Sequence, residues 1–273
     1  MPVSQITLPS CGSLQYYDSD ESSKTCLVIL GASPSDIRDY DGIKSSLEAK
    51  FRLITLNWPG FGGSTLDNAA IDDGALFLHQ IALEFLEALT IPPAIFIGVA
   101  VGAYCACRIA LERPKRVLRL ALVSPVGFAI GGPLARLYAA LMGSKFAPKP
   151  VTYAKSYLGH KEKPLVKQML ERAATLHSAP AAVSMIRSVW RSLSQTDCDL
   201  TLKATRIKIP VLLIFGKNDP IVPPSKDGKV AKKAFGEGAG FVVLEARHLP
   251  FAEIPDEFLK SVMPFLCEEE DLL

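Results

Sequence analysis

The segment with the clearest chemical content is residues 97–103, where an apolar run turns directly into a helical pattern. Gly98 and Gly102 flank Ala100 with the G-x-S-x-G spacing of a nucleophile elbow, a strand-to-helix turn that holds its central residue at strained dihedrals. A serine at the centre of such a turn attacks carbonyl carbons and forms an acyl-enzyme. The side chain of Ala100 is a methyl group without an oxygen atom, so the spacing predicts the turn without its nucleophile.

Four other motifs extend this pattern, and with them the sequence resembles the α/β-hydrolase superfamily over nearly its whole length. The elbow precedes Asp219 and His248, which is the chain order of nucleophile, acid and base in this fold. Leu30 stands where the oxyanion loop of the family usually has a histidine. The four motifs are residues 30–32 (LGA), 57–64 (NWPGFGGS), 216–223 (GKNDPIVP) and 246–255 (ARHLPFAEIP).

The resemblance implies a role for each matched residue. His248 would be the general base, because an imidazole changes charge near neutral pH. Asp219 would hold the tautomer of His248 and stabilise the imidazolium. The backbone N–H groups of Ala32 and Val101 would stabilise a developing oxyanion. Further residues expected to line the substrate pocket are Gly31, Trp58 and Leu249.

Ala100 leaves three interpretations open. It is an engineered replacement of serine in a competent hydrolase, a natural residue in a protein that only binds a ligand or partner, or part of an enzyme whose His248–Asp219 pair acts alone as a base. Loss of a triad serine costs on the order of a million-fold in turnover, so no acyl-enzyme is expected as the sequence stands. Ser64 and Ser124 do not lie on the elbow, and neither is expected to replace the nucleophile.

The parent activity that the resemblance implies is serine-type hydrolysis of a small hydrophobic ester, amide, lactone or carbon–carbon substrate. Epoxide and haloalkane hydrolysis are disfavoured, because those enzymes carry an aspartate on the elbow. Acyltransferase and lyase variants of the fold stay open. No metal or organic cofactor is implied, and we expect a monomer or a homodimer.

Apolar runs that alternate with helical patterns must position these residues. The alternation predicts an α/β fold, with a mostly parallel central sheet and helices on both faces. A helix is predicted over residues 37–49. Strands are predicted at residues 4–9, 13–17, 26–30, 51–56, 95–98, 118–123, 211–215 and 240–245.

Between residues 126 and 205 the pattern changes to helical segments punctuated by glycine and proline. We expect a helical lid there, inserted into a hydrolase core of residues 1–125 and 206–273. An apolar lid that lines a tunnel favours a small organic substrate over a peptide or a polymer. The apolar stripe of one lid helix consists of Leu134, Leu137, Tyr138, Leu141 and Met142.

Composition and charge exclude several classes of protein. The 273 residues include 30 Lys and Arg and 28 Asp and Glu, and this net charge of +2 predicts no nucleic-acid partner. No apolar run reaches the roughly 18 residues of a membrane helix, and the N-terminus has no signal-peptide pattern. We therefore expect no membrane partner and a cytoplasmic location. The six cysteines form no CxxC pair and predict free, buried thiols.

Overall fold

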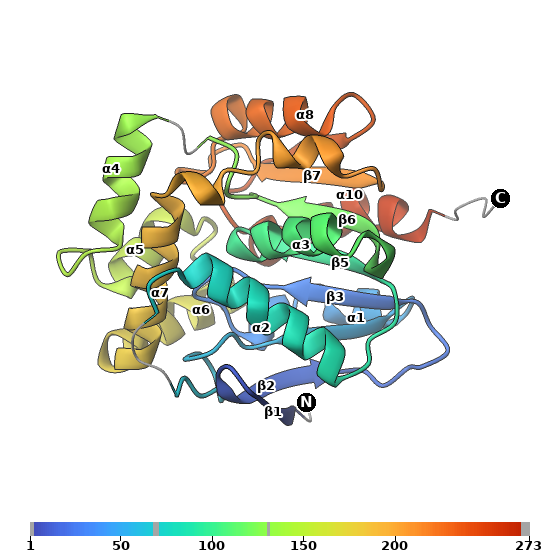
Figure 1. The fold of residues 1–273 in the computed structure, drawn as a ribbon, viewed down its shortest axis with the longest axis horizontal. Helices are drawn as coiled ribbons and strands as arrows, with labels where there is room; N and C mark the ends of the chain where they lie inside the picture. The colour runs from blue at the N-terminus through green and yellow to red at the C-terminus, as the bar shows by residue number, and fades with distance from the viewer. Residues whose placement is uncertain (1–2, 68–70, 130–131, 269–273) are drawn as a thin grey trace.

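The computed structural model describes residues 3–67, 71–129 and 132–268. Within these residues one sheet has eight strands in the order β1-β2-β4-β3-β5-β6-β7-β8 (Figure 1). β2 pairs antiparallel with β1 and with β4, whereas every other pair is parallel. The strands are β1 (Ser4–Leu8), β2 (Gly12–Asp18), β3 (Cys26–Leu30), β4 (Arg52–Leu56), β5 (Ala94–Val99), β6 (Val117–Val123), β7 (Val211–Gly216) and β8 (Gly240–Leu244).

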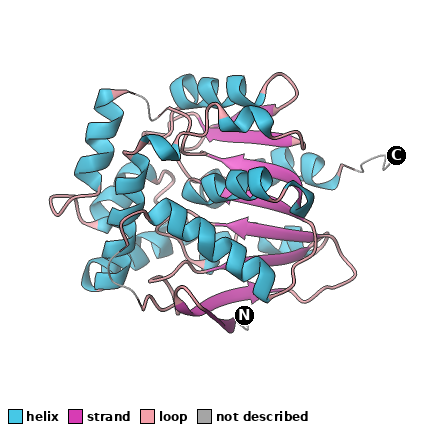
Figure 2. Ribbon diagram, in the orientation of Figure 1, coloured by secondary structure: helices cyan, strands magenta, loops and turns pink. Residues whose placement is uncertain are grey.

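Helices cover both faces of this sheet. Figure 1 shows α2 and α3 in front of the sheet and α1 and α10 behind it, and Figure 2 shows the same layers by type of structure. The fold is therefore the predicted α/β-hydrolase architecture. The described helices are α1 (Lys44–Glu48), α2 (Gly74–Ala88), α3 (Val101–Glu112), α4 (Pro133–Met142), α5 (Pro150–Tyr157), α6 (Pro164–Thr175), α7 (Pro180–Leu193), α8 (Lys229–Phe235), α9 (Pro250–Glu253) and α10 (Pro255–Cys267).

The central strands are buried on both faces. Every residue of β3, β5 and β7 is buried, and so is most of β6. A strand covered on both sides needs a nearly continuous apolar sequence, which is why the sequence predicts these strands closely. β8 lies at the edge of the sheet, where Phe241 and Val243 are exposed.

Helices α4 to α7 follow one another between β6 and β7, in the part of the chain where the sequence predicts helical segments. Most of the predicted apolar stripe on α4 faces away from the rest of the protein. Leu134, Leu137 and Leu141 are exposed, whereas Met142 at the end of the helix is buried. An apolar stripe shows that a helix has an apolar face, but not which element meets that face.

The predicted helix over residues 37–49 is interrupted. Residues 37–40 form a short 3-10 turn, η1 (Ile37–Tyr40), and α1 begins only at Lys44. The turn closes on itself because Asp36 accepts a hydrogen bond from the amide of Arg38 and donates its own amide to Asp39. These local bonds satisfy the polar groups of a single turn and end the helical pattern there.

The cysteines follow the prediction with one exception. All six are free, and five of them are buried. Cys267, in the last turn of α10, is exposed. None of the described helices combines the length and the apolar composition that crossing a membrane requires.

Candidate active site

The turn between β5 and α3 has the conformation that the G-x-S-x-G spacing predicts. Ala100 has φ 49° and ψ −111°, in a region that residues with a Cβ rarely adopt. The amide of Ala100 donates to the carbonyl of Val123 on β6 at 3.0 Å, and the carbonyl of Ala100 accepts from the amide of Ala103 at 3.1 Å. Neighbouring elements thus hold the strained residue in place from both sides.

The two elbow glycines are required by close packing. A Cβ on Gly102 would overlap the carbonyl oxygen of Leu30, the last residue of β3. A Cβ on Gly98 would lie 2.5 Å from the Cα of Ala103, far inside van der Waals contact. Only glycine at both positions lets α3 approach the ends of β3 and β5, so the spacing is a packing requirement of the turn.

Asp219 and His248 lie at the same end of the sheet and are bonded to each other. Asp219 follows β7 and His248 follows β8, and these strands are parallel neighbours. The Nδ1 atom of His248 is 2.8 Å from the Oδ2 atom of Asp219. Both residues are only 4% exposed, so water screens this pair poorly.

The surroundings of Asp219 favour its ionised form. Burial raises the pKa of its carboxyl, but the charge of His248 and the hydrogen bond from its ring lower the pKa more. The Oδ1 atom also accepts hydrogen bonds from the amides of Ile221, at 2.8 Å, and Val222, at 3.1 Å. Together these partners hold the pKa of Asp219 below its ordinary value. A carboxylate in this state can orient the imidazole and stabilise its protonated form.

Glu253 holds the loop that carries His248, a role that the sequence did not reveal. Its side chain is completely buried, on α9 just after the histidine. One carboxylate oxygen accepts from the amide of Arg247 at 2.9 Å, and the other accepts from the amide of Leu249 at 3.1 Å. The two residues that flank His248 are therefore both fixed by one carboxylate. The only sequence signal was the position of Glu253 in the motif of residues 246–255.

The backbone of His248 is also held by two other parts of the chain. Its amide donates to the carbonyl of Tyr157 on α5 at 3.2 Å, and its carbonyl accepts from the hydroxyl of Ser124 at 3.2 Å. The ring of Tyr157 meets the imidazole edge-on, with centroids 5.5 Å apart. Ser124 thus positions the histidine rather than occupying the elbow.

Ala100 and His248 line one small cavity of about 40 Å³. Tyr153 and Tyr157 of α5 and Trp190 of α7 border it, so the helices between β6 and β7 supply much of its wall. The lining is mostly apolar. Its residues are Ala32, Ser33, Pro34, Ala100, Val101, Val126, Tyr153, Tyr157, Val189, Trp190, Leu193, Ile221 and His248.

The three residues expected to line the substrate pocket do not border this cavity. Trp58 is fully buried in the core, and its indole N–H donates to the carbonyl of Gly31 at 2.9 Å. Trp58 therefore supports the loop that leads to Ala32 instead of meeting a ligand. Gly31 and Leu249 lie next in sequence to the lining residues Ala32 and His248, but neither of them lines the cavity.

The amides of Ala32 and Val101 belong to residues that do line the cavity. Val101 is the first residue of α3, and the first N–H groups of a helix have no partner within it. No hydrogen bond from either amide to another described residue is found. Both N–H groups can therefore donate to an oxygen atom of a ligand, and the positive end of the α3 dipole favours a negatively charged one.

The model of the α/β-hydrolase fold family matches residues 27–255, which is most of the chain and includes every part of this site. The protein belongs to the α/β-hydrolase family. The matched range includes the elbow, Asp219 and His248.

Known proteins similar to this member of the α/β-hydrolase family include several esterases. A pimeloyl-(acyl-carrier protein) methyl ester esterase of Citrobacter koseri is 26% identical over 262 residues, covering 91% of this chain and 96% of the relative. A hydrolase structure from Pseudomonas aeruginosa has a TM-score of 0.81 at 24% identity and covers 97% of this chain and 98% of its own. The enol-lactonase structure from Burkholderia xenovorans has a TM-score of 0.76 at 20% identity, with 97% and 100% covered. At these identities the two structures show the shared fold alone.

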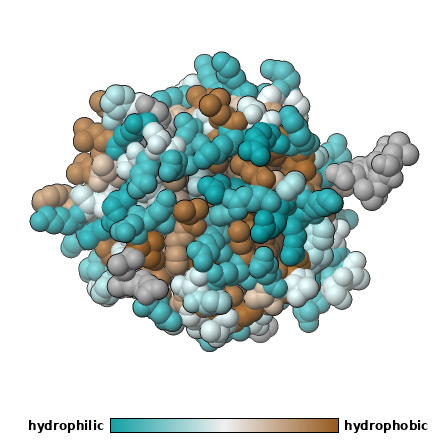
Figure 3. Space-filling view, viewed as in Figure 1, coloured by the Kyte–Doolittle hydropathy of each residue, from teal (hydrophilic) through white to brown (hydrophobic). Residues whose placement is uncertain are grey.

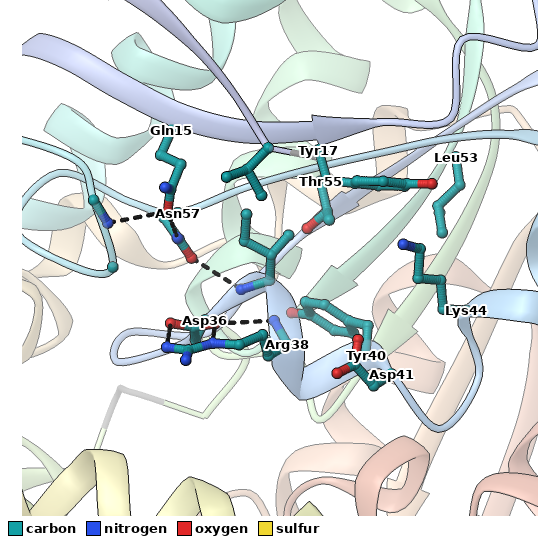
Figure 4. A pocket seen from close by; sticks show the side chains of 14 residues that line it. Gln15, Tyr17, Asp36, Arg38, Tyr40, Asp41, Lys44, Leu53, Thr55 and Asn57 are labelled. Atoms are coloured by element: carbon teal, nitrogen blue, oxygen red, sulfur yellow. Dashed lines mark hydrogen bonds and ion pairs between the residues drawn. The ribbon is translucent and has the colours of Figure 1, made fainter. Parts of the chain in front are cut away.

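A larger hollow among the described residues lies elsewhere, over β2, β4 and η1, and has a volume of about 560 Å³. Figure 4 shows its polar wall, in which the side chain of Asn57 donates to Gln15 at 2.8 Å and Arg38 pairs with Asp36 at 2.7 Å. Neither the elbow nor the Asp219–His248 pair contributes to it. Volume alone therefore does not identify the chemical site. No group of three or more His, Cys, Asp or Glu side chains among the described residues is arranged to hold a metal ion.

Proposed function

We propose that this chain is built for serine-type hydrolysis of a small, hydrophobic ester, amide, lactone or carbon–carbon substrate. With Ala100 at the nucleophile position it binds such a molecule without forming an acyl-enzyme. The observation that carries the proposal is the strained backbone of Ala100, at φ 49°, on the same cavity as a His248 ring bonded to Asp219 at 2.8 Å. Backbone strain at Ala100 beside a bonded Asp219–His248 pair is the arrangement that nucleophilic catalysis requires, and it has no structural purpose of its own.

The lining of the cavity supports the kind of substrate. Its walls are mainly apolar and include Tyr153, Tyr157 and Trp190, which suit a hydrophobic acyl or alcohol group. The amides of Ala32 and Val101 supply donors for the oxyanion that forms when an ester carbonyl is attacked. The names of the similar methyl ester esterase and enol-lactonase point to the same bond types.

A second candidate function uses His248 without a covalent intermediate. A cavity of about 40 Å³ is large enough for a water molecule, which needs roughly 10–15 Å³ of such volume. His248 shares that cavity with the two unpartnered amides. A water deprotonated by His248 could attack a bound carbonyl directly, with Asp219 stabilising the imidazolium.

The test compares the chain with its Ala100→Ser variant on p-nitrophenyl butyrate. We expect Ala100→Ser to raise turnover by at least 10³-fold and to show an acyl-enzyme by mass spectrometry, because the remaining machinery is in place. Ala100→Gly is the matched control, since it changes the same position without adding an oxygen. If the unmodified chain itself hydrolyses the ester, with dependence on His248 and no acyl-enzyme, the water mechanism is supported. If folded Ala100→Ser is inert toward short-chain esters, lactones and fluorophosphonate reagents, the proposal fails.

A further inference from the structure

Helix α4 exposes a continuous apolar face. Leu134 is 83% exposed and Leu137 is 69% exposed, and Tyr138 and Leu141 on the same face are also exposed. These positions follow the i, i+3, i+4, i+7 spacing that places side chains on one side of a helix. Phe146, shortly after the helix, is 75% exposed. Five of the ten large hydrophobic side chains exposed in the described part of the chain thus lie within residues 134–146.

The opposite side of α4 is anchored to the protein. Ala139 and Met142 are buried there, and the half-exposed ring of Tyr138, at the edge of the apolar face, meets the ring of Trp190 on α7 edge-on at 5.7 Å. Figure 1 places α4 at the margin of the molecule, and Figure 3 shows brown, hydrophobic side chains along that same margin. The exposed leucines therefore belong to a helix whose other side is packed against the protein.

The charge of this region is of one sign. The sequence has no Asp or Glu between Glu112 and Glu162, although the whole chain is nearly neutral. Residues 133–155 include four basic residues, all with exposed positions: Arg136, Lys145, Lys149 and Lys155. Asp227, an acidic residue that lines a small hollow together with residues of α4, is partly buried. An apolar helix face with exposed cations around it is complementary to an anionic lipid surface.

We propose that α4 and Phe146 form a docking surface for an anionic lipid bilayer. The leucines and Phe146 would enter the boundary between headgroups and acyl chains, and Lys145 and Lys149 would contact the phosphates. The sequence predicted no membrane partner because no segment is long enough to span a bilayer. An amphipathic helix that lies in the interface needs no such span.

The position of α4 also connects this surface to the candidate active site. Ala135, Tyr138 and Ala139 line a hollow of about 100 Å³ together with Val126 and Trp190. The last two residues, like Leu193 and Ile221, also line the cavity of Ala100 and His248. Docking would place this side of the cavity against the lipid, so that a hydrophobic ester could enter from the membrane. This consequence rests on the proposed function, whereas the docking surface does not.

The test is flotation of the full chain with vesicles of pure phosphatidylcholine and of phosphatidylcholine with 30% phosphatidylserine. We expect partition onto the anionic vesicles that weakens in high salt. The double variant Leu134→Gln/Leu137→Gln should bind at least tenfold more weakly, because two large side chains no longer enter the bilayer. The pair Lys145→Gln/Lys149→Gln should lose about 25-fold on anionic vesicles, at about fivefold for each charge.

Matched controls come from elements other than α4. Leu202→Gln alters a leucine that is as exposed as Leu134, and Lys208→Gln/Lys260→Gln removes two exposed charges away from α4. Neither control should change partition. The proposal is overturned if the parent chain does not float with anionic vesicles, or if the controls lose as much binding as the α4 variants. It is also overturned if light scattering shows a dimer that Leu134→Gln/Leu137→Gln dissociates, because a second copy would then cover this face.

Discussion

The candidate site has two halves, the elbow around Ala100 and the acid–base pair of Asp219 and His248, and different parts of the chain hold each half in shape. The elbow half is made by backbone: Gly98 and Gly102 permit close packing, and the side chain of Ala100 takes part in no hydrogen bond. The acid–base half is made by side chains, since Asp219 bonds to His248 and Glu253 holds the loop. The elbow can therefore keep its shape without its reactive group, whereas the other half cannot lose a side chain without leaving buried polar groups unpaired.

The largest effect should appear when the two halves are made to work together. In the Ala100→Ser background, His248→Ala should reduce ester turnover by at least 10³-fold, because the new hydroxyl loses its base. Steady-state kinetics with p-nitrophenyl butyrate measures this loss. His79→Ala is a control, because His79 lies on α2 and pairs with Glu112 away from the cavity. A loss of similar size in both variants would mean that His248 does not act as the base for the serine introduced at position 100.

The next largest effect concerns Glu253, on which the geometry of the acid–base half depends. Glu253→Gln replaces one acceptor oxygen by an NH₂ group that faces a backbone N–H, which should destabilise the fold by about 2–3 kcal/mol. Urea unfolding at neutral pH measures the change. Glu257→Gln, at an exposed position on α10, should stay within about 0.5 kcal/mol of the parent. Equal stability of the two variants would show that the His248 loop does not need the carboxylate.

A smaller effect should follow the titration of Asp219. Because its pKa is lower in the folded protein than in an unfolded chain, ionised Asp219 stabilises the fold above about pH 4. That stabilisation is lost as the pH falls through the folded pKa. The parent should therefore lose more unfolding free energy between pH 6 and pH 3 than Asp219→Asn does. Asp256→Asn is the control at an exposed site, and identical pH profiles for Asp219→Asn and the parent would contradict the assignment.

The smallest effect is expected on the elbow itself. Ala100→Gly removes the strain of a positive φ, which costs on the order of 1–3 kcal/mol. This gain in stability offsets two losses, the buried methyl group and the larger conformational entropy of the unfolded chain. The stability of this variant should lie within about 0.5 kcal/mol of the parent or above it. Ala106→Gly, at a buried position with ordinary helical geometry in α3, should cost about 1–2 kcal/mol. Thermal unfolding of both variants decides whether the strain at Ala100 is real, because equal losses would argue against it.

Much of the fold could be predicted because its signals are local. The strands predicted at 26–30 and 118–123 lie within a residue of β3 and β6, since buried parallel strands need continuous apolar runs. The interruption at η1 was missed because helical spacing of apolar residues says nothing about the side-chain caps of Asp36 and Asp39. The pocket wall was missed for another reason. Trp58 is adjacent to a loop of the site but turns into the core, while Tyr153 and Tyr157 come from a distant helix.

The sequence by itself determined where the elbow lies, because the spacing of Gly98, Ala100 and Gly102 can be read within one short segment. The contacts that hold the turn, from Gly102 to Leu30 of β3 and from Ala100 to Val123 of β6, depend on the tertiary structure. The sequence also determined the order of the strands along the chain and hence the α/β class. Only the tertiary structure decided which groups meet. The bond between Asp219 and His248, separated by 29 residues, depends on the parallel pairing of β7 with β8. The exposure of Leu134 and Leu137 likewise depends on the absence of a facing element within the described chain, because an apolar stripe fixes a helix face but not its partner.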